Sequence, residues 1–192
     1  MKMWSISFRI WHWIHAFVVL SLLATVFLRK TFLSWRANSE ILASNLLTMD
    51  VDITGEQAEI LAKAVRSPMW EWHIMFGYAL SLLIFIRMLL FFTTSGKQNF
   101  INLKSLNLHK KMVSLGYIGI YSILVFMSIS GLIMSFHEEL FLVKETVHDI
   151  KEVHEFVFNA VWIFVSLHIA GLIVAENTDE KGIVSDMING GK

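Results

Sequence analysis

The sequence contains no cysteine, a single proline among 192 residues, and no excess of charge of either sign. The absence of cysteine excludes disulfides, iron–sulfur clusters and the C-x-x-C-H motif that attaches c-type haem. A formal net charge of zero, without a basic stripe interleaved with aromatic residues, argues against nucleic-acid binding. Any haem in this chain would therefore be held by coordination and packing alone.

Apolar residues, in contrast, are abundant. They make up 55% of the chain and include fifteen phenylalanines, which is more apolar surface than a soluble domain of this size buries. Four apolar segments have roughly the twenty residues that a membrane-spanning helix requires. They cover about residues 10–28, 72–92, 112–136 and 154–175. We therefore predict an all-α integral membrane protein built as a four-transmembrane-helix bundle.

The first segment is predicted to be a retained span rather than a cleaved signal peptide. It is long, carries Trp11 and Trp13 as interfacial anchors, and lacks a small-x-small cleavage site. Residues 29–71 are expected to form a polar outer loop. Within it, Thr54-Gly-Glu-Gln57 has the form of a capping box and predicts a short surface helix over Glu56–Arg66 that ends near Pro68. Residues 176–192 form a polar tail that is too short to be a domain.

The charges of the connecting loops predict the orientation in the membrane. The loop after the second span carries only basic charges, at Lys97, Lys104, Lys110 and Lys111. The loop after the third span carries five acidic residues against two lysines, namely Glu138, Glu139, Glu145, Asp149 and Glu152. Basic loops stay in the cytoplasm, so both termini are predicted to be cytoplasmic, although three basic residues in the outer loop weaken this bias.

Two histidines of the fourth segment, His154 and His168, stand fourteen residues apart. On a helix, fourteen steps of 100° come within about 40° of whole turns, so both imidazoles face the same way, roughly 21 Å apart along the axis. That distance crosses most of the hydrocarbon core of a membrane. Polar residues inside a membrane are costly and need partners. This helix therefore offers one nitrogen ligand near each membrane surface.

Other histidines lie at matching depths. His168 shares the cytoplasmic side with His12 and His15, and His154 shares the outer side with His73. An iron in a six-coordinate haem takes two imidazoles from opposite faces of the porphyrin, and such closed coordination suits electron transfer. The residues thus predict an inner pair, His168 with His12 or His15, and an outer pair, His73 with His154. Depth alone slightly favours His15 over His12.

Further residues fit haem at these two levels. Arg87 follows His73 by fourteen residues and projects from the same helix face at the inner level, where haem propionates would satisfy its charge. Arg9 has the same role or binds phospholipid headgroups. Gly77, one turn after His73, and Gly131 in the third span remove a side chain where a porphyrin approaches the backbone. The three remaining histidines fall in loops or at span ends, where we expect solvated side chains: His109, His137 and His148.

These motifs resemble those of the bacterial cytochrome b561 and nickel–iron hydrogenase cytochrome b subunit family, whose members hold two b-type haems in a four-helix membrane bundle. The resemblance spans all four segments and is carried by Arg9-Ile-Trp-His12-Trp13, His73-x-x-x-Gly77 followed by Arg87, Gly131, and the His154/His168 pair. It implies that residues 1–192 form one membrane domain with ligand pairs His12/His168 and His73/His154, so His12 rather than His15. The tail is similar to the hydrogenase-associated branch, whereas the long loop 29–71 departs from the family.

The resemblance implies a function in the respiratory chain of a bacterial cytoplasmic (inner) membrane. The protein is expected to bind two non-covalent haem b groups and to pass electrons between a periplasmic partner and quinone or menaquinone, as an electron-transfer subunit of an oxidoreductase complex. The partner would be a hydrogenase-like oxidoreductase or a c-type cytochrome, with membrane lipid around the spans. Two alternatives stay open. One is a self-sufficient quinone oxidoreductase acting on a small molecule such as superoxide, and the other is a histidine-based membrane metal transporter without a haem spectrum.

Overall fold

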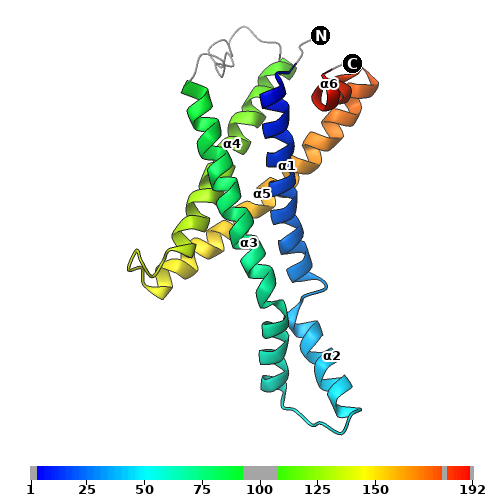
Figure 1. Cartoon of the computed structure of the whole chain (residues 1–192), viewed down its shortest axis with the longest axis vertical. Coiled ribbons are helices and arrows are strands. Elements are labelled where there is room, and N and C mark those ends of the chain that lie inside the picture. Colours follow the sequence, from blue (N-terminus) through cyan, green and yellow to red (C-terminus); the bar gives the residue numbers. More distant parts are fainter. Residues whose placement is uncertain (1–3, 93–107, 179–180, 191–192) are drawn as a thin grey trace. The chain divides into compact units, whose positions relative to one another are not determined.

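The computed structural model describes residues 4–92, 108–178 and 181–190, and these contain helices and no strands (Figure 1). The helices are α1 (Ile6–Lys30), α2 (Trp35–Leu47), α3 (Gly55–Phe92), α4 (Leu108–Ser135), α5 (Lys144–Asn177) and α6 (Ile183–Asn189). Four of them contain segments long and apolar enough to cross a membrane, at Ile6–Lys30, Gly55–Leu89, Lys111–Ser135 and Lys144–Asn177. The predicted all-α class with four membrane-spanning helices is confirmed.

The surfaces of the long helices are mostly apolar. Phe17 in α1 is 63% exposed and Leu167 in α5 is 66% exposed, and many other large apolar side chains of these helices are also exposed. In water, each such surface would cost about 25 cal/mol per Å² of apolar area. In a bilayer, the same side chains contact lipid tails without that cost. The exposed apolar surface therefore supports the membrane assignment.

The stretch 29–71, predicted to be a polar loop, is largely helical, and this prediction is wrong. The capping box is present, because the Thr54 N–H donates to Gln57 Oε1 at 2.9 Å and the Gln57 N–H donates to Thr54 Oγ1 at 3.2 Å. The helix that it starts does not end near Pro68 but continues as α3 to Phe92. Proline already has a helical φ and removes one donor, and membrane helices accommodate that loss. The expected surface helix is therefore the first part of the same continuous helix that contains the second span.

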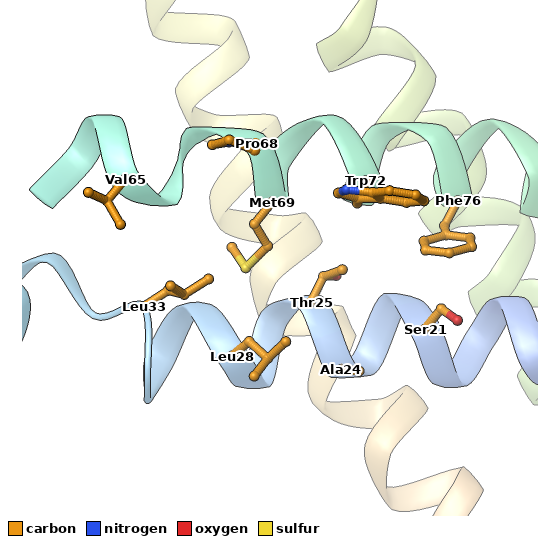
Figure 2. A pocket seen from close by; sticks show the side chains of 10 residues that line it. All are labelled: Ser21, Ala24, Thr25, Leu28, Leu33, Val65, Pro68, Met69, Trp72 and Phe76. Carbon is orange, nitrogen blue, oxygen red and sulfur yellow. The ribbon is translucent and has the colours of Figure 1, made fainter.

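The chain divides into two compact units, Met1–Ala16 with Tyr78–Lys192, and Phe17–Gly77. In the first unit, α4 packs against α5 and α5 packs against α6. In the second unit, α2 lies against the start of α3, where Lys63 Nζ is 5.2 Å from the centroid of the Trp35 ring. This unit also contains an open, largely apolar cavity of about 420 Å³. Figure 2 shows its lining side chains, most of which come from α1 and α3.

The polar tail has a defined structure of its own. The carboxylate of Glu176, near the end of α5, accepts hydrogen bonds from the N–H groups of Gly182 at 2.9 Å and Val184 at 3.0 Å. From α1, Trp13 Nε1 donates to the carbonyl oxygen of Met187 at 3.1 Å, and Arg9 Nη1 donates to that of Ile188 at 3.3 Å. The tail therefore folds back as α6 onto the beginning of α1.

The structure describes only some of the charged loop residues from which the membrane orientation is predicted. Lys97 and Lys104 lie outside the described residues, as does the side chain of Lys110. The acidic residues stand in the turn after α4 and in the first turns of α5, and their side chains are exposed.

Candidate haem sites

The inner pair brings together residues from the first and the last long helix. The imidazole centroids of His12 in α1 and His168 in α5 are 6.4 Å apart, with an angle of 61° between the ring planes. Each ring also stacks on a phenylalanine one turn earlier, with centroid distances of 6.5 Å for Phe8–His12 and 5.9 Å for Phe164–His168. Side chains four residues apart are neighbours on a helix. The phenylalanines therefore help to set the ring orientations.

The separation of these two rings fits a shared iron. A metal ion binds an imidazole nitrogen at about 2 Å, so two imidazoles on opposite sides of one iron place their centroids about 6 Å apart. The observed 6.4 Å between His12 and His168 is close to that value. The residues present at this end of the first unit thus fit a haem held by two histidines.

His15, the sequence alternative to His12, has a different environment. Its ring stacks on Trp11 with a centroid distance of 4.8 Å and an interplanar angle of 20°. Trp11 is held in turn, because its Nε1 donates to the carbonyl oxygen of Leu83 at 3.2 Å. His15 Nε2 is buried and has no hydrogen-bond partner in the described part of the chain. The structure thus brings His12 to His168 and packs His15 against an indole.

Two arginines lie at this end of the first unit. The guanidinium carbon of Arg87 is 5.3 Å from the ring centroids of both Phe8 and Trp11. Such cation–π contacts contribute about 0.5–2 kcal/mol each. Arg9 donates from Nη1 to the Ile188 carbonyl oxygen, while its Nε is buried without a partner among the described residues. Both positive charges thus lie on or beside the aromatic residues that precede His12 in α1.

The histidines of the predicted outer pair belong to different compact units, and each is held by a hydroxyl of its own unit. His154 Nδ1 is 2.7 Å from Ser130 Oγ in α4, and His73 Nδ1 is 2.7 Å from Thr25 Oγ1 in α1. A Cβ on Gly131 would lie 3.7 Å from His154 Cε1, so this glycine adjoins the imidazole itself. A Cβ on Gly77 would meet no described protein atom within 4 Å.

The other histidines have local partners. His137 Nδ1 lies 2.9 Å from the Met134 carbonyl oxygen, and the exposed His148 forms an ion pair of 3.6 Å with Glu152 when it is protonated. The side chain of His109 lies outside the described residues. Over the described ranges, no group of three or more histidine and acidic side chains comes together as a metal site.

Sequence reasoning missed the two hydroxyls and the contacts of α6. Thr25 and Ser130 are polar residues within apolar runs, as are Ser21 and Ser128, and this was the available signal. The signal is weak, because serine and threonine in helices commonly bond to their own backbone carbonyls. The partner histidines lie on other helices, and helical periodicity relates only residues within the same helix.

Comparison with known protein families decides the class of the protein. The family model for prokaryotic cytochrome b561 matches residues 3–190. The chain belongs to the prokaryotic cytochrome b561 family. It is therefore a membrane-bound b-type cytochrome of electron transfer, and the resemblance read from the sequence is confirmed. No curated protein and no solved structure matches this cytochrome.

Proposed function

We propose that this cytochrome holds two non-covalent haem b groups and carries electrons across a bacterial cytoplasmic membrane, between a periplasmic redox partner and the quinone pool. The partner is a hydrogenase-like oxidoreductase or a c-type cytochrome. The observation that carries the proposal is the inner pair, in which two imidazoles from sequence-distant helices stand at the separation of a doubly ligated iron.

The residues have distinct roles in this proposal. His12 and His168 bind the inner haem iron, and Arg87 and Arg9 supply positive charge for its propionates. A bound haem with histidine on both faces exchanges single electrons and offers no open position for a substrate. The phenylalanines behind the two imidazoles hold the rings in place, so little rearrangement of these ligands accompanies a change of charge.

A second haem, bound by His73 and His154, is supported by the sequence spacing and by the family. α5 is continuous from Lys144 to Asn177, so His154 and His168 are separated by fourteen residues of helix, or about 21 Å. One haem near one surface would leave an electron on that side of the membrane. Ligands at these two positions of α5 would provide a stepping point toward each surface. Gly77 leaves room for the outer porphyrin, and Gly131 leaves room for the His154 ring.

The outer surface is proposed as the docking side. The acidic residues of 137–153 are exposed next to His154, where their charge would steer a basic patch of a redox partner toward the outer ligands. Quinone would then exchange electrons with the inner haem, and both chain termini would lie in the cytoplasm.

An optical spectrum of the purified protein tests the cofactor directly. We expect a reduced-minus-oxidised b-type spectrum and a pyridine haemochrome assay that gives two haem b per chain. One haem per chain would remove the outer pair from the proposal. A protein that binds exchangeable metal and shows no haem band would be a histidine-based transporter.

Deletion of the gene in the native organism tests the role. We expect a periplasmic oxidoreductase to lose its coupling to quinone while it still reduces or oxidises artificial dyes. If no such enzyme is uncoupled, and the purified cytochrome alone turns over a small molecule such as superoxide with quinone, the protein is a self-sufficient oxidoreductase.

A further inference from the structure

Two hydroxyls in separate units of the chain have the same bonding pattern. Thr25 Oγ1 is 2.7 Å from the Leu22 carbonyl oxygen of its own helix and 2.7 Å from His73 Nδ1. Ser130 Oγ is 2.7 Å from the Phe126 carbonyl oxygen of its own helix and 2.7 Å from His154 Nδ1. Thr25 is 8% exposed and Ser130 is 3% exposed, so neither hydroxyl has ready access to water.

A count of hydrogens determines the direction of these bonds. A hydroxyl has one hydrogen to donate and a carbonyl oxygen has none. Two oxygens held 2.7 Å apart without a hydrogen between them repel each other, so each hydroxyl must donate to its backbone carbonyl. The contact with the imidazole is then a hydrogen bond only if the histidine donates from Nδ1. His73 and His154 are therefore fixed as the tautomer with a proton on Nδ1 and the lone pair on Nε2.

We propose that Thr25 and Ser130 are positioning residues that present Nε2 of His73 and His154 to the outer haem iron. This inference rests on the proposed function, in which these two histidines are the outer ligands. A histidine that binds a metal ordinarily donates its other ring N–H to an acceptor, which fixes the tautomer and the ring orientation and raises the basicity of the ligating nitrogen. Each outer histidine has such an acceptor on a neighbouring helix, one residue before Gly131 in the case of His154.

The bonding pattern has a consequence for the redox equilibrium. A more basic Nε2 stabilises Fe(III) over Fe(II), because the oxidised iron carries more positive charge. Removal of the acceptor hydroxyl should therefore raise the midpoint potential of the outer haem. Removing the hydrogen-bond acceptor of a metal-binding histidine typically weakens metal binding about tenfold or more. If only the binding of Fe(III) is weakened, a tenfold change in that affinity raises the midpoint potential by about 59 mV for a one-electron couple.

Redox titration of the purified holoprotein tests the inference, with the outer haem defined as the one lost in His154→Ala. Thr25→Val and Ser130→Ala should each shift the outer Fe(III)/Fe(II) equilibrium about tenfold toward Fe(II) and change its low-spin EPR signature, while the inner haem stays as in the wild type. Thr25→Ser retains a hydroxyl and should restore the wild-type potential. Ser128→Ala is the matched control on α4, since the buried Ser128 hydroxyl has no hydrogen-bond partner in the described chain.

The possible outcomes separate the inference from the proposed function. If His154→Ala removes one haem but Thr25→Val and Ser130→Ala leave both potentials and EPR signals unchanged, the hydroxyls only satisfy their own helices and the inference is overturned. If His154→Ala retains both haems, the ligand assignment itself fails. Should Thr25→Val lose the outer haem altogether, retention of that haem in Thr25→Ser supports the inference, and its loss in both variants counts against a role of the hydroxyl.

Discussion

At the scale of single residues, His12 and His15 illustrate how neighbours select between two similar side chains. Both histidines precede the middle of α1 and both touch aromatic rings. His12 lies between Phe8 and the imidazole of His168, whereas His15 is stacked on an indole that is itself hydrogen-bonded to α3. This difference leads to opposite expectations for their replacement.

His12→Ala should remove the inner haem and spare the outer one, because only the inner iron loses a ligand. His15→Ala should retain both haems, since its ring packs against Trp11 rather than His168. Haem content per chain, measured by pyridine haemochrome together with low-temperature spectra, checks both variants. Full haem content in His12→Ala combined with loss in His15→Ala would transfer the ligand role to His15.

Arg87 is the second residue with a predicted electrostatic effect. A unit charge about 10 Å away, at an effective dielectric constant of about 20, contributes about 1.7 kcal/mol. Arg87→Leu should therefore lower the inner midpoint potential, because without the positive charge the oxidised iron is relatively favoured. The shift in the redox equilibrium should be on the order of tenfold. Arg87→Lys keeps the charge and serves as the control, and a change confined to the outer haem would show that Arg87 does not act on the inner one.

Much of the candidate site was accessible from the sequence. The fourteen-residue spacing in the fourth segment, matched by depth to His12 or His15 and to His73, was sufficient to identify five histidines of interest. The choice of His12 over His15 was not accessible from depth, because it depends on how α1 is rotated toward α5. Thr25 and Ser130 were not accessible either, since their histidine partners lie on other helices.

At the scale of elements, α6 shows how a short polar segment becomes ordered. Seven residues are too few for a stable isolated helix. α6 is held at its start by the Glu176 carboxylate and along its end by donors from α1. Hydrogen bonds to an ionised carboxylate are about twice as strong as neutral ones. The helix thus depends on contacts with other elements rather than on its own propensity.

Glu176→Gln should loosen α6, because a neutral amide oxygen is a weaker acceptor for the backbone N–H groups of Gly182 and Val184. We expect hydrogen exchange across 182–189 to accelerate by about tenfold, measured by mass spectrometry in detergent. Glu152→Gln, an exposed change on the same helix, is the control. Equal protection of this segment in both variants would mean that α1 alone holds the tail.

The boundaries of α3 show how far helix starts and ends can be predicted from local sequence signals. The capping box correctly placed the beginning of α3, because its two reciprocal hydrogen bonds are local. Pro68 does not end the helix, contrary to the prediction, because the helix on either side of it persists without that single donor. Local signals thus mark where a helix starts more reliably than they mark whether an internal proline ends it.

At the scale of the whole molecule, the absence of cysteine makes the membrane orientation directly measurable. Single-cysteine variants introduce a unique thiol at the exposed Glu139 on one side and at the half-exposed Ser185 on the other. Glu139→Cys, in the turn after α4, should react with a membrane-impermeant maleimide in intact spheroplasts, since the acidic loop is proposed to be periplasmic. Ser185→Cys in α6 should react only after lysis. Labelling of Ser185→Cys alone in intact spheroplasts would invert the proposed topology.

The contacts of α1 with α6 also concern the order in which the protein is made. Arg9 and Trp13 bind backbone groups 179 and 174 residues further along the chain, and His12 meets an imidazole of the last long helix. At about 5–20 residues per second, synthesis of the intervening chain takes roughly ten seconds or more. During that time the first helix is already in the membrane without its partners. The approach of His12 to His168 is thus among the last events of biogenesis, and a chain truncated before α5 contains only one of the two histidines proposed to bind the inner haem.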